Sequence, residues 1–111
     1  MREGDVVVSV VWHTTPFRGE KFEEAWRPAA AAALDYGATY WALLRSKDDP
    51  NDFQQIAAFA DKKAWERYWY SEEISEARAD AHGLYEVPLL PVWFRAVGAG
   101  ELVEDGVAAT Q

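Results

Sequence analysis

A β-branched, apolar run close to the start of the chain, VVVSVVWHT at Val6–Thr14, constrains the fold most strongly. Its even positions from Val6 to Trp12 are all apolar, and its odd positions from Val7 to His13 are apolar except for Ser9 and His13. Side chains alternate between the two sides of a strand, so both sides of this strand would be apolar. We therefore expect a strand whose two faces are both covered.

A helix and a pair of strands are predicted next. Phe17–Tyr36 has a broad apolar face and ends before Gly37, a typical helix stop, but it contains Pro28, where we expect a kink or a new turn. Ala38–Ser46 and Phe53–Ala60 are strand-like runs joined by a polar turn, which predicts a hairpin.

The second half of the chain repeats the helix-then-strand order. Asp61 and Ser71 are N-cap residues for the predicted helices Lys62–Tyr70 and Glu72–His82, and the last strand is Val92–Val97. The resulting order, β-α-β-β-α-β, predicts an α+β, ferredoxin-like fold with a four-stranded antiparallel sheet and its helices on one face. We expect one such domain over residues 1–98 and a flexible tail over residues 99–111.

The chain contains six tryptophans, which is more large aromatic surface than one small core needs. The sheet face that the helices leave uncovered is also apolar, and a second copy of the same sheet is its simplest cover. We therefore expect a homodimer. Some of the strand tryptophans, Trp12, Trp41 and Trp93, should then face the partner, while the helix tryptophans face the sheet or a ligand pocket.

The charge of the chain excludes several classes of function. The formal net charge of −8 repels phosphate backbones and anionic lipid surfaces, so we expect neither nucleic acid nor membrane as a partner. The absence of cysteine excludes disulfides and thiolate metal sites. We read no signal peptide in the first residues and expect a cytoplasmic protein.

The segment Phe59–Trp93, FADKKAWERYWYSEEISEARADAHGLYEVPLLPVW, resembles the antibiotic biosynthesis monooxygenase-like family of dimeric α+β barrels. The similarity in topology and length extends over about residues 5–98. It implies a homodimer whose sheets meet face to face, with a pocket between the sheet and the helices of each subunit. Members of that family oxidise aromatic polyketides with O2 and no cofactor, and others bind and degrade heme. We therefore expect no cofactor and a small aromatic molecule as a ligand.

The residues do not match the heme-binding branch of that family. The resemblance would require an asparagine on the first strand, a tryptophan near the second helix and a histidine seven residues after Ser71. Arg78 occupies the histidine position, Tyr68 the tryptophan position, and Asn51 lies in the hairpin turn. His82, one helical turn beyond Arg78, is the remaining candidate ligand for heme.

The first group of candidate site residues lies on the predicted helix Lys62–Tyr70. Trp65, Tyr68 and Trp69 stand at helical spacing and could stack on an aromatic ligand or simply form core.

Arg78 and Tyr85 are candidates for binding an anion or phenolate, with His82 as a base beside them, although Arg and His are also common in the last turn of a helix. His13 is a second candidate base, with a purely structural role as the alternative. Two histidines without a clear arrangement of carboxylates predict no metal site.

Two classes of function follow from these observations. The first is a small-molecule-binding homodimer that acts as a cofactor-independent oxygenase on an aromatic or polyketide-like substrate. The second is a dimer of the same fold that binds ligands, or has a structural role, without catalysis. A heme-binding or heme-degrading protein is a third possibility. Fold alone does not choose between them, because function depends on the site.

Overall fold

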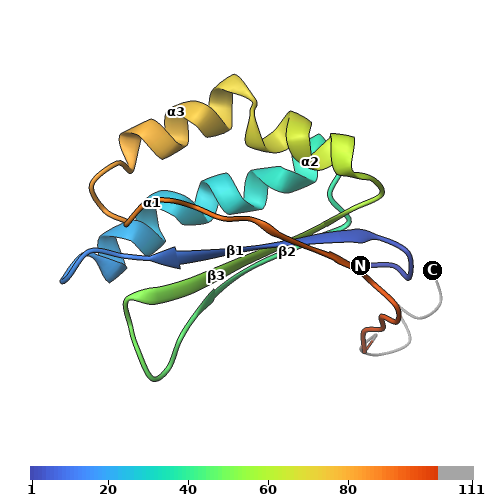
Figure 1. Cartoon of the computed structure of the whole chain (residues 1–111), viewed down its shortest axis with the longest axis horizontal. Coiled ribbons are helices and arrows are strands. Elements are labelled where there is room, and N and C mark those ends of the chain that lie inside the picture. The colour runs from blue at the N-terminus through green and yellow to red at the C-terminus, as the bar shows by residue number, and fades with distance from the viewer. Residues whose placement is uncertain (103–111) are drawn as a thin grey trace.

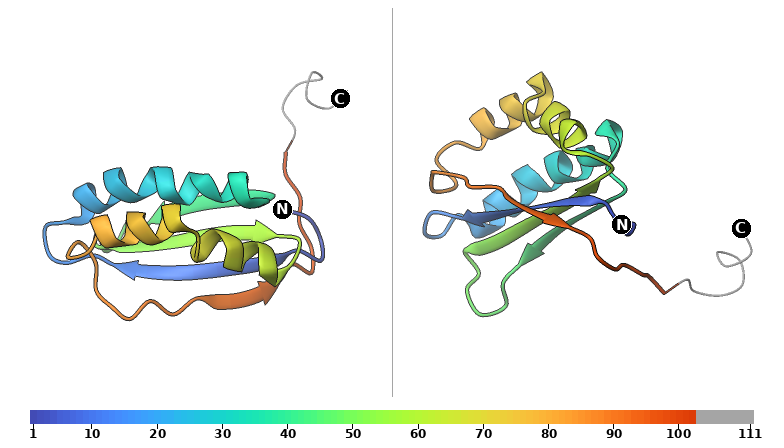
Figure 2. Two further views of the ribbon diagram at one scale, coloured as in Figure 1. Left: turned by 90° about the horizontal axis from the view of Figure 1, so that it is seen from above. Right: turned by 45° about the vertical axis from the view of Figure 1, so that its right-hand side comes forward.

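A computed structural model describes residues 1–102 and shows a four-stranded antiparallel sheet with all its helices on one side (Figures 1 and 2). The strand order is β2-β3-β1-β4, and β4 lies beside β1 at one edge (Figure 2). The elements are β1 (Val6–His13), α1 (Gly19–Ala31), the 3-10 helix η1 (Ala32–Tyr36), β2 (Tyr40–Arg45), β3 (Asp52–Phe59), α2 (Lys62–Trp69), α3 (Glu72–Asp80) and β4 (Val92–Arg95). The predicted ferredoxin-like α+β fold is confirmed, with the second helical region divided into α2 and α3.

The first helical region is shorter than predicted at its start and divided near its end. Phe17 has a φ of 66°, a left-handed conformation that a helix cannot contain, and α1 begins only at Gly19. The helix continues through Pro28, with no new start there, and tightens into η1 from Ala32. Gly37 ends it with a φ of 95°, as predicted, because glycine adopts this conformation without steric cost.

The two predicted N-caps are confirmed by their hydrogen bonds. Asp61 Oδ1 accepts from the backbone N–H of Ala64 at 2.9 Å, and Ser71 Oγ accepts from that of Ile74 at 3.2 Å. Each side chain satisfies one of the free N–H groups of a helix start. Asp61 thus fixes the start of α2, and Ser71, soon after the end of α2, fixes the start of α3.

The strand register assigns every strand tryptophan to the side that the helices cover. Trp12 stands opposite Phe53, Trp41 opposite Ala57, and Trp93 opposite Val8, which is buried in the core between sheet and helices. The expectation that some strand tryptophans face a partner subunit is therefore wrong. The reason is register, since β2 and β4 pair so that their tryptophans share the parity of Trp12.

The other side of the sheet, which we call the open face, is mostly apolar, and its polar strand residues are Ser9, His13, Asp52 and Gln54. Ser9 Oγ accepts a hydrogen bond from Gln54 Nε2 at 2.7 Å. Around this pair, large apolar side chains are exposed: Val11, Tyr40, Leu44, Val92 and Phe94. The face that the helices leave uncovered is therefore apolar, as the alternation in Val6–Thr14 predicts.

Residues 98–102 continue from β4 without regular structure, and the rest of the predicted tail lies outside the described residues. Within residues 1–102, no helix has the length and apolar character that crossing a bilayer requires.

Candidate functional site

The space between the sheet and the helices is filled by aromatic side chains around one buried glutamine. Gln55 Oε1 accepts hydrogen bonds from Trp12 Nε1 at 3.2 Å and from Trp26 Nε1 at 2.9 Å. Its Nε2 donates to Tyr68 Oη at 2.9 Å, and Tyr68 Oη in turn donates to the carbonyl of Ala29 at 2.7 Å. We call these four side chains, Trp12, Trp26, Gln55 and Tyr68, the glutamine hub.

The glutamine hub fills the centre of the core. Trp12, Trp26 and Tyr68 have no exposed surface, and Trp12 packs on Trp26 with ring centroids 4.6 Å apart. Within residues 1–102, no buried side-chain N or O atom that is described lacks a hydrogen-bond partner. A satisfied and densely packed core has neither the space nor the free polar groups that a ligand needs. The centre of the space between sheet and helices, where the resemblance implies a pocket, is therefore filled by the side chains of the glutamine hub.

Burial also makes Tyr68 a poor acid. It raises the pKa of the Tyr68 hydroxyl above its ordinary value of 10.0, because an ionised phenolate would be poorly solvated among aromatic rings. The hydrogen bond from Gln55 opposes this rise without reversing it. Tyr68 was predicted to bind substrate, but its hydroxyl is occupied within the glutamine hub and faces Ala29.

A hollow of about 240 Å³ opens at the edge of the aromatic layer, between α2 and β4. We call it the rim groove. Trp65 and Trp69 stack with centroids 4.9 Å apart, and Trp93 meets Trp65 at 87° with centroids 5.9 Å apart. The exposed fraction rises outward from 2% for Trp65 and 7% for Trp69 to 37% for Trp93. The lining residues are Lys62, Trp65, Glu66, Trp69, Tyr70, Pro91 and Trp93.

Local sequence explains how these side chains reach the rim groove. Trp65 and Trp69 are one turn apart on α2, so both lie on one face of that helix. Pro91 immediately precedes β4 and cannot donate a backbone hydrogen bond, which suits the start of an edge strand. Trp93 then follows at the helix-facing parity of β4. The floor of the groove is thus formed by α2 and its outer wall by β4.

Arg78 contacts the aromatic layer from α3. Its guanidinium carbon lies 4.3 Å from the ring centroid of Trp69, and its Nη1 donates to the Trp69 carbonyl at 2.7 Å. Burial lowers the pKa of the Arg78 side chain below its ordinary value, an effect that nearby tyrosines oppose. Arg78 is thus held by the protein itself at the position where the heme-binding branch has its histidine.

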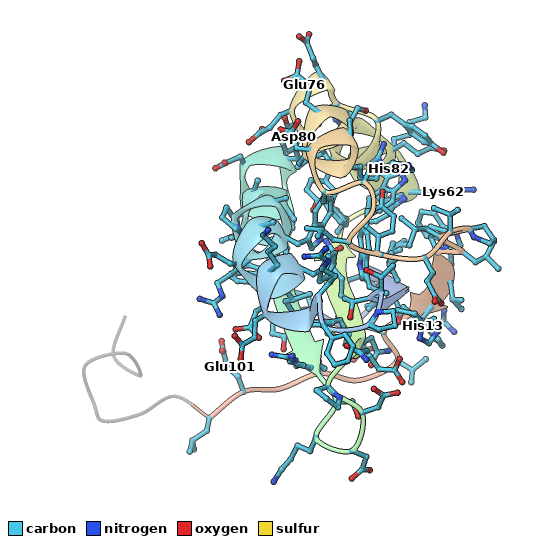
Figure 3. All side chains as sticks on the ribbon, turned by 90° about the vertical axis from the view of Figure 1, so that its left-hand side faces the viewer. His13, Lys62, Glu76, Asp80, His82 and Glu101 are labelled. Carbon is cyan, nitrogen blue, oxygen red and sulfur yellow. The ribbon has the colours of Figure 1, made fainter. Side chains whose placement is uncertain are left out.

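Tyr85 lies beside Arg78, whereas His82 is exposed to solvent. The Tyr85 hydroxyl donates to the backbone carbonyl of Arg78 at 3.3 Å, and burial raises the pKa of that hydroxyl. The side chain of His82 is exposed at the end of the helical layer, as Figure 3 shows. Of the three predicted residues, Arg78 and Tyr85 therefore donate hydrogen bonds from their guanidinium and phenol groups to backbone carbonyls.

His13 lies on the sheet, apart from His82 in the helical layer (Figure 3). Its Nδ1 is 2.5 Å from Asp52 Oδ1, with the two side chains 56% and 40% exposed. In the neutral tautomer that carries its proton on Nδ1, His13 donates to the carboxylate and Nε2 is an acceptor, the arrangement of a general base. Asp52 also lines a hollow of about 300 Å³ on the open face, together with Val11, Leu44, Arg45, Ser46, Phe53 and Gln54.

The sequence alone did not identify three of the residues that define these sites. Gln55 is polar within the strand-like run FQQIAAFA, and its parity with Phe53 and Ala57 was the signal that it is buried. Lys62 and Pro91 line the rim groove only because α2 and β4 lie side by side, which no local pattern shows. In the described part of the chain, no group of three or more His, Cys, Asp or Glu residues could hold a metal ion.

Neither a protein-family model nor a curated protein matches this sequence. Solved structures do match its fold. A presumed antibiotic biosynthesis monooxygenase from Nitrosomonas europaea has a TM-score of 0.76 and 20% identity, covering 84% of this chain and 99% of the other. SnoaB, a cofactor-independent oxygenase from Streptomyces nogalater, has a TM-score of 0.70 and 18% identity, covering 92% of this chain and 99% of the other.

PA3566 from Pseudomonas aeruginosa has a TM-score of 0.76 and 16% identity, covering 88% of this chain and 99% of the other. These structures confirm the resemblance to antibiotic biosynthesis monooxygenase-like proteins at the level of the fold. At such identities, a shared fold does not carry over a reaction or its residues.

Proposed function

We propose that this protein is a homodimer that binds planar aromatic small molecules in the rim groove. The observation that carries the proposal is the gradient of exposure across Trp65, Trp69 and Trp93, from buried floor to open wall. A hollow lined by aromatic rings and bounded by a few polar groups is the usual form of a small-molecule site. At about 240 Å³ the rim groove is smaller than the roughly 300–1,000 Å³ of typical ligand pockets, so we propose a small ligand of about two fused rings.

The glutamine hub supports this location. Since Gln55 uses both ends of its amide within the core, a ligand there would have to displace bonded tryptophans and a bonded tyrosine. The rim groove requires no such displacement, because Trp93 and Tyr70 are already exposed. Ligand stacking on these rings adds to the burial of apolar area.

The open face supports the dimer. Five large apolar side chains are exposed on it, namely Val11, Tyr40, Leu44, Val92 and Phe94. A second copy would cover this apolar surface with an identical surface by twofold symmetry.

Tryptophan fluorescence during titration with 2-naphthol, a neutral two-ring probe, tests the ligand site. We expect saturable quenching in the wild-type protein and at least about tenfold weaker binding for Trp93→Leu, because the exposed wall is lost. Phe94→Leu is the matched control, since Phe94 is the next residue of β4 and points to the open face. Absence of saturable quenching, or equal weakening by both variants, contradicts the proposed site.

A second candidate function, a cofactor-independent oxygenase, is favoured by the fold shared with SnoaB and by the His13–Asp52 pair beside the 300 Å³ hollow. His13 Nε2 would accept a proton from an acidic CH2 group of a phenolic substrate. The resulting carbanion would supply the electrons that reduce O2, so that CH2 and O2 give C=O and H2O.

Oxygen uptake with a panel of phenolic, polyketide-like substrates tests this candidate. His13→Gln should abolish any uptake that the wild-type protein catalyses, whereas His82→Gln should not, because the two histidines lie in different layers of the molecule (Figure 3). Equal loss in both variants would argue against His13 as the base.

A further inference from the structure

The charged side chains at the rim groove indicate which planar aromatic ligands it prefers. Lys62 lines the groove, and its Nζ lies 5.0 Å from the ring centroid of Trp93, over the exposed wall. Figure 3 shows Lys62 projecting from the helical layer on the side of the molecule where β4 lies. Its ammonium is thus positioned over the surface on which a ligand would stack.

The cations of this region lie against the aromatic rings of the groove. Arg78 lies over Trp69 as Lys62 lies over Trp93. Glu66 also lines the groove, one turn after Lys62 on α2, but no ion pair joins the two side chains among the described residues. Among the described residues, no salt bridge to a carboxylate therefore holds the Lys62 ammonium.

The position of Lys62 contrasts with the negative net charge of the whole chain. Eleven basic residues stand against nineteen acidic ones, so the overall field repels anions. The ammonium of Lys62, over the indole of Trp93, places one positive charge at the exposed outer wall of the groove. The Lys62 side chain is exposed, and the attraction between its ammonium and the face of Trp93 holds the charge at the groove.

Resting on the proposed ligand site, we propose that the rim groove selects planar aromatic anions, with Lys62 as the partner of the ligand's carboxylate or phenolate. The fused rings stack on Trp93 and Tyr70 above the edges of Trp65 and Trp69. The anionic group lies at the mouth of the groove, where the ammonium reaches it. An exposed ion pair of this kind corresponds to a preference of about fivefold over a neutral ligand of the same shape.

Two probes with the same ring system test this selectivity, 2-naphthoate and its neutral amide, 2-naphthamide. Binding is measured by tryptophan fluorescence to the wild-type protein, to Lys62→Met and to Lys63→Met. Methionine keeps the length of the side chain and removes its charge. Lys63 is the matched control, because it is the next residue of α2, is exposed, and changes the net charge by the same amount.

We expect the wild-type protein to bind 2-naphthoate about fivefold more tightly than 2-naphthamide, and this preference to shrink as salt is added. Lys62→Met should reduce the ratio to about one, and Lys63→Met should leave it unchanged. Equal binding of both probes to the wild-type protein, or equal loss of preference in both variants, overturns the assignment to Lys62 while leaving the aromatic site in place. Binding of neither probe overturns the proposed function together with this inference.

Discussion

Gln54 and Gln55 are neighbours on β3, yet they lie on opposite faces of the sheet and in very different surroundings. Gln55 is 1% exposed and joins two indoles and a phenol in the glutamine hub. Gln54 is exposed on the open face and makes one hydrogen bond, to Ser9. On the covered face, the polar groups are hydrogen-bonded within the core. The open face and the rim groove, in contrast, expose side chains that a partner or a ligand could contact. The two binding functions that we propose therefore use the open regions of the molecule.

The largest expected effect comes from a substitution at the centre of the covered face, in the glutamine hub. Gln55→Leu removes the acceptor of Trp12 and Trp26 and leaves two buried indole N–H groups unpaired. At about 1–3 kcal/mol for each unpaired group, we expect the free energy of unfolding to fall by about 3–5 kcal/mol in urea titrations. Gln54→Leu is the matched control on the open face, where a change within about 0.5 kcal/mol is expected. Similar losses in the two variants would remove the distinction between the faces.

The open face is tested by placing a charge on it. Leu44→Glu should weaken the proposed dimer by about a hundredfold, because twofold symmetry buries two unpaired carboxylates at the interface. Sedimentation equilibrium would then report the 12.5 kDa chain where the wild-type protein gives twice that mass. Leu34→Glu is the control, since Leu34 is 52% exposed and Leu44 48% exposed, but Leu34 lies on η1. A wild-type protein that stays monomeric at micromolar concentration would contradict the dimer.

A smaller loss is expected at the edge of the glutamine hub. Tyr68→Phe removes the hydroxyl that donates to Ala29 and accepts from Gln55, which should cost about 1–2 kcal/mol of unfolding free energy. Tyr70→Phe is the control, because Tyr70 is 72% exposed.

The pH dependence of this loss gives an independent check. Since the fold raises the pKa of Tyr68, its contribution is complete below the unfolded value of about 10 and is lost as pH rises above it. The difference between the wild-type protein and Tyr68→Phe should therefore shrink in alkaline urea titrations. A difference that stays constant above that pH would show that the hydroxyl is not buried as described.

The smallest effect lies outside both faces, at the start of β1. Asp5 Oδ2 accepts hydrogen bonds from Thr39 Oγ1 at 2.6 Å and from the backbone N–H of Arg2 at 2.8 Å, and the bond from Thr39 is the main cause that lowers the pKa of this carboxyl. A lowered pKa stabilises the fold above the unfolded value of 3.8, and this stabilisation is lost as pH falls through the folded value.

Asp5→Asn should therefore cost about 1 kcal/mol at neutral pH and less in acid, where the wild-type carboxyl is protonated. Thermal unfolding across the acid range measures this difference, with Asp35→Asn, an exposed residue of η1, as the control. A cost that does not change with pH would rule out the carboxylate as its source.

The sequence predicted the fold well because its signals are local. The alternation of Val6–Thr14, the caps Asp61 and Ser71, and the stop at Gly37 each act within a few residues. It could not place the rim groove, because that groove depends on register and on which elements lie side by side. The placement of Trp93 on the helix side follows from its pairing with Val8, and the burial of Gln55 from contacts with α1 and α2.

The predicted binding residues fall into two groups in the structure. Trp65 and Trp69 line the rim groove, while the Tyr68 and Tyr85 hydroxyls and the Arg78 guanidinium are engaged by the protein itself. Helical spacing could identify the aromatic face of α2, but it could not show which of its rings would reach the surface. The assignment of His13 and His82 to catalysis stays a prediction, with only His13 placed beside a carboxylate.

The central claim is that the glutamine hub is closed and that ligands bind at the rim groove. The indole N–H signals of the six tryptophans, recorded by 15N–1H NMR during titration with 2-naphthol, test it most directly. We predict that Trp93 shifts most, that Trp65 and Trp69 follow, and that Trp12 and Trp26 keep their positions because both are bonded to Gln55. Shifts of Trp12 and Trp26 that equal or exceed that of Trp93 would show a ligand entering the core and would contradict the claim.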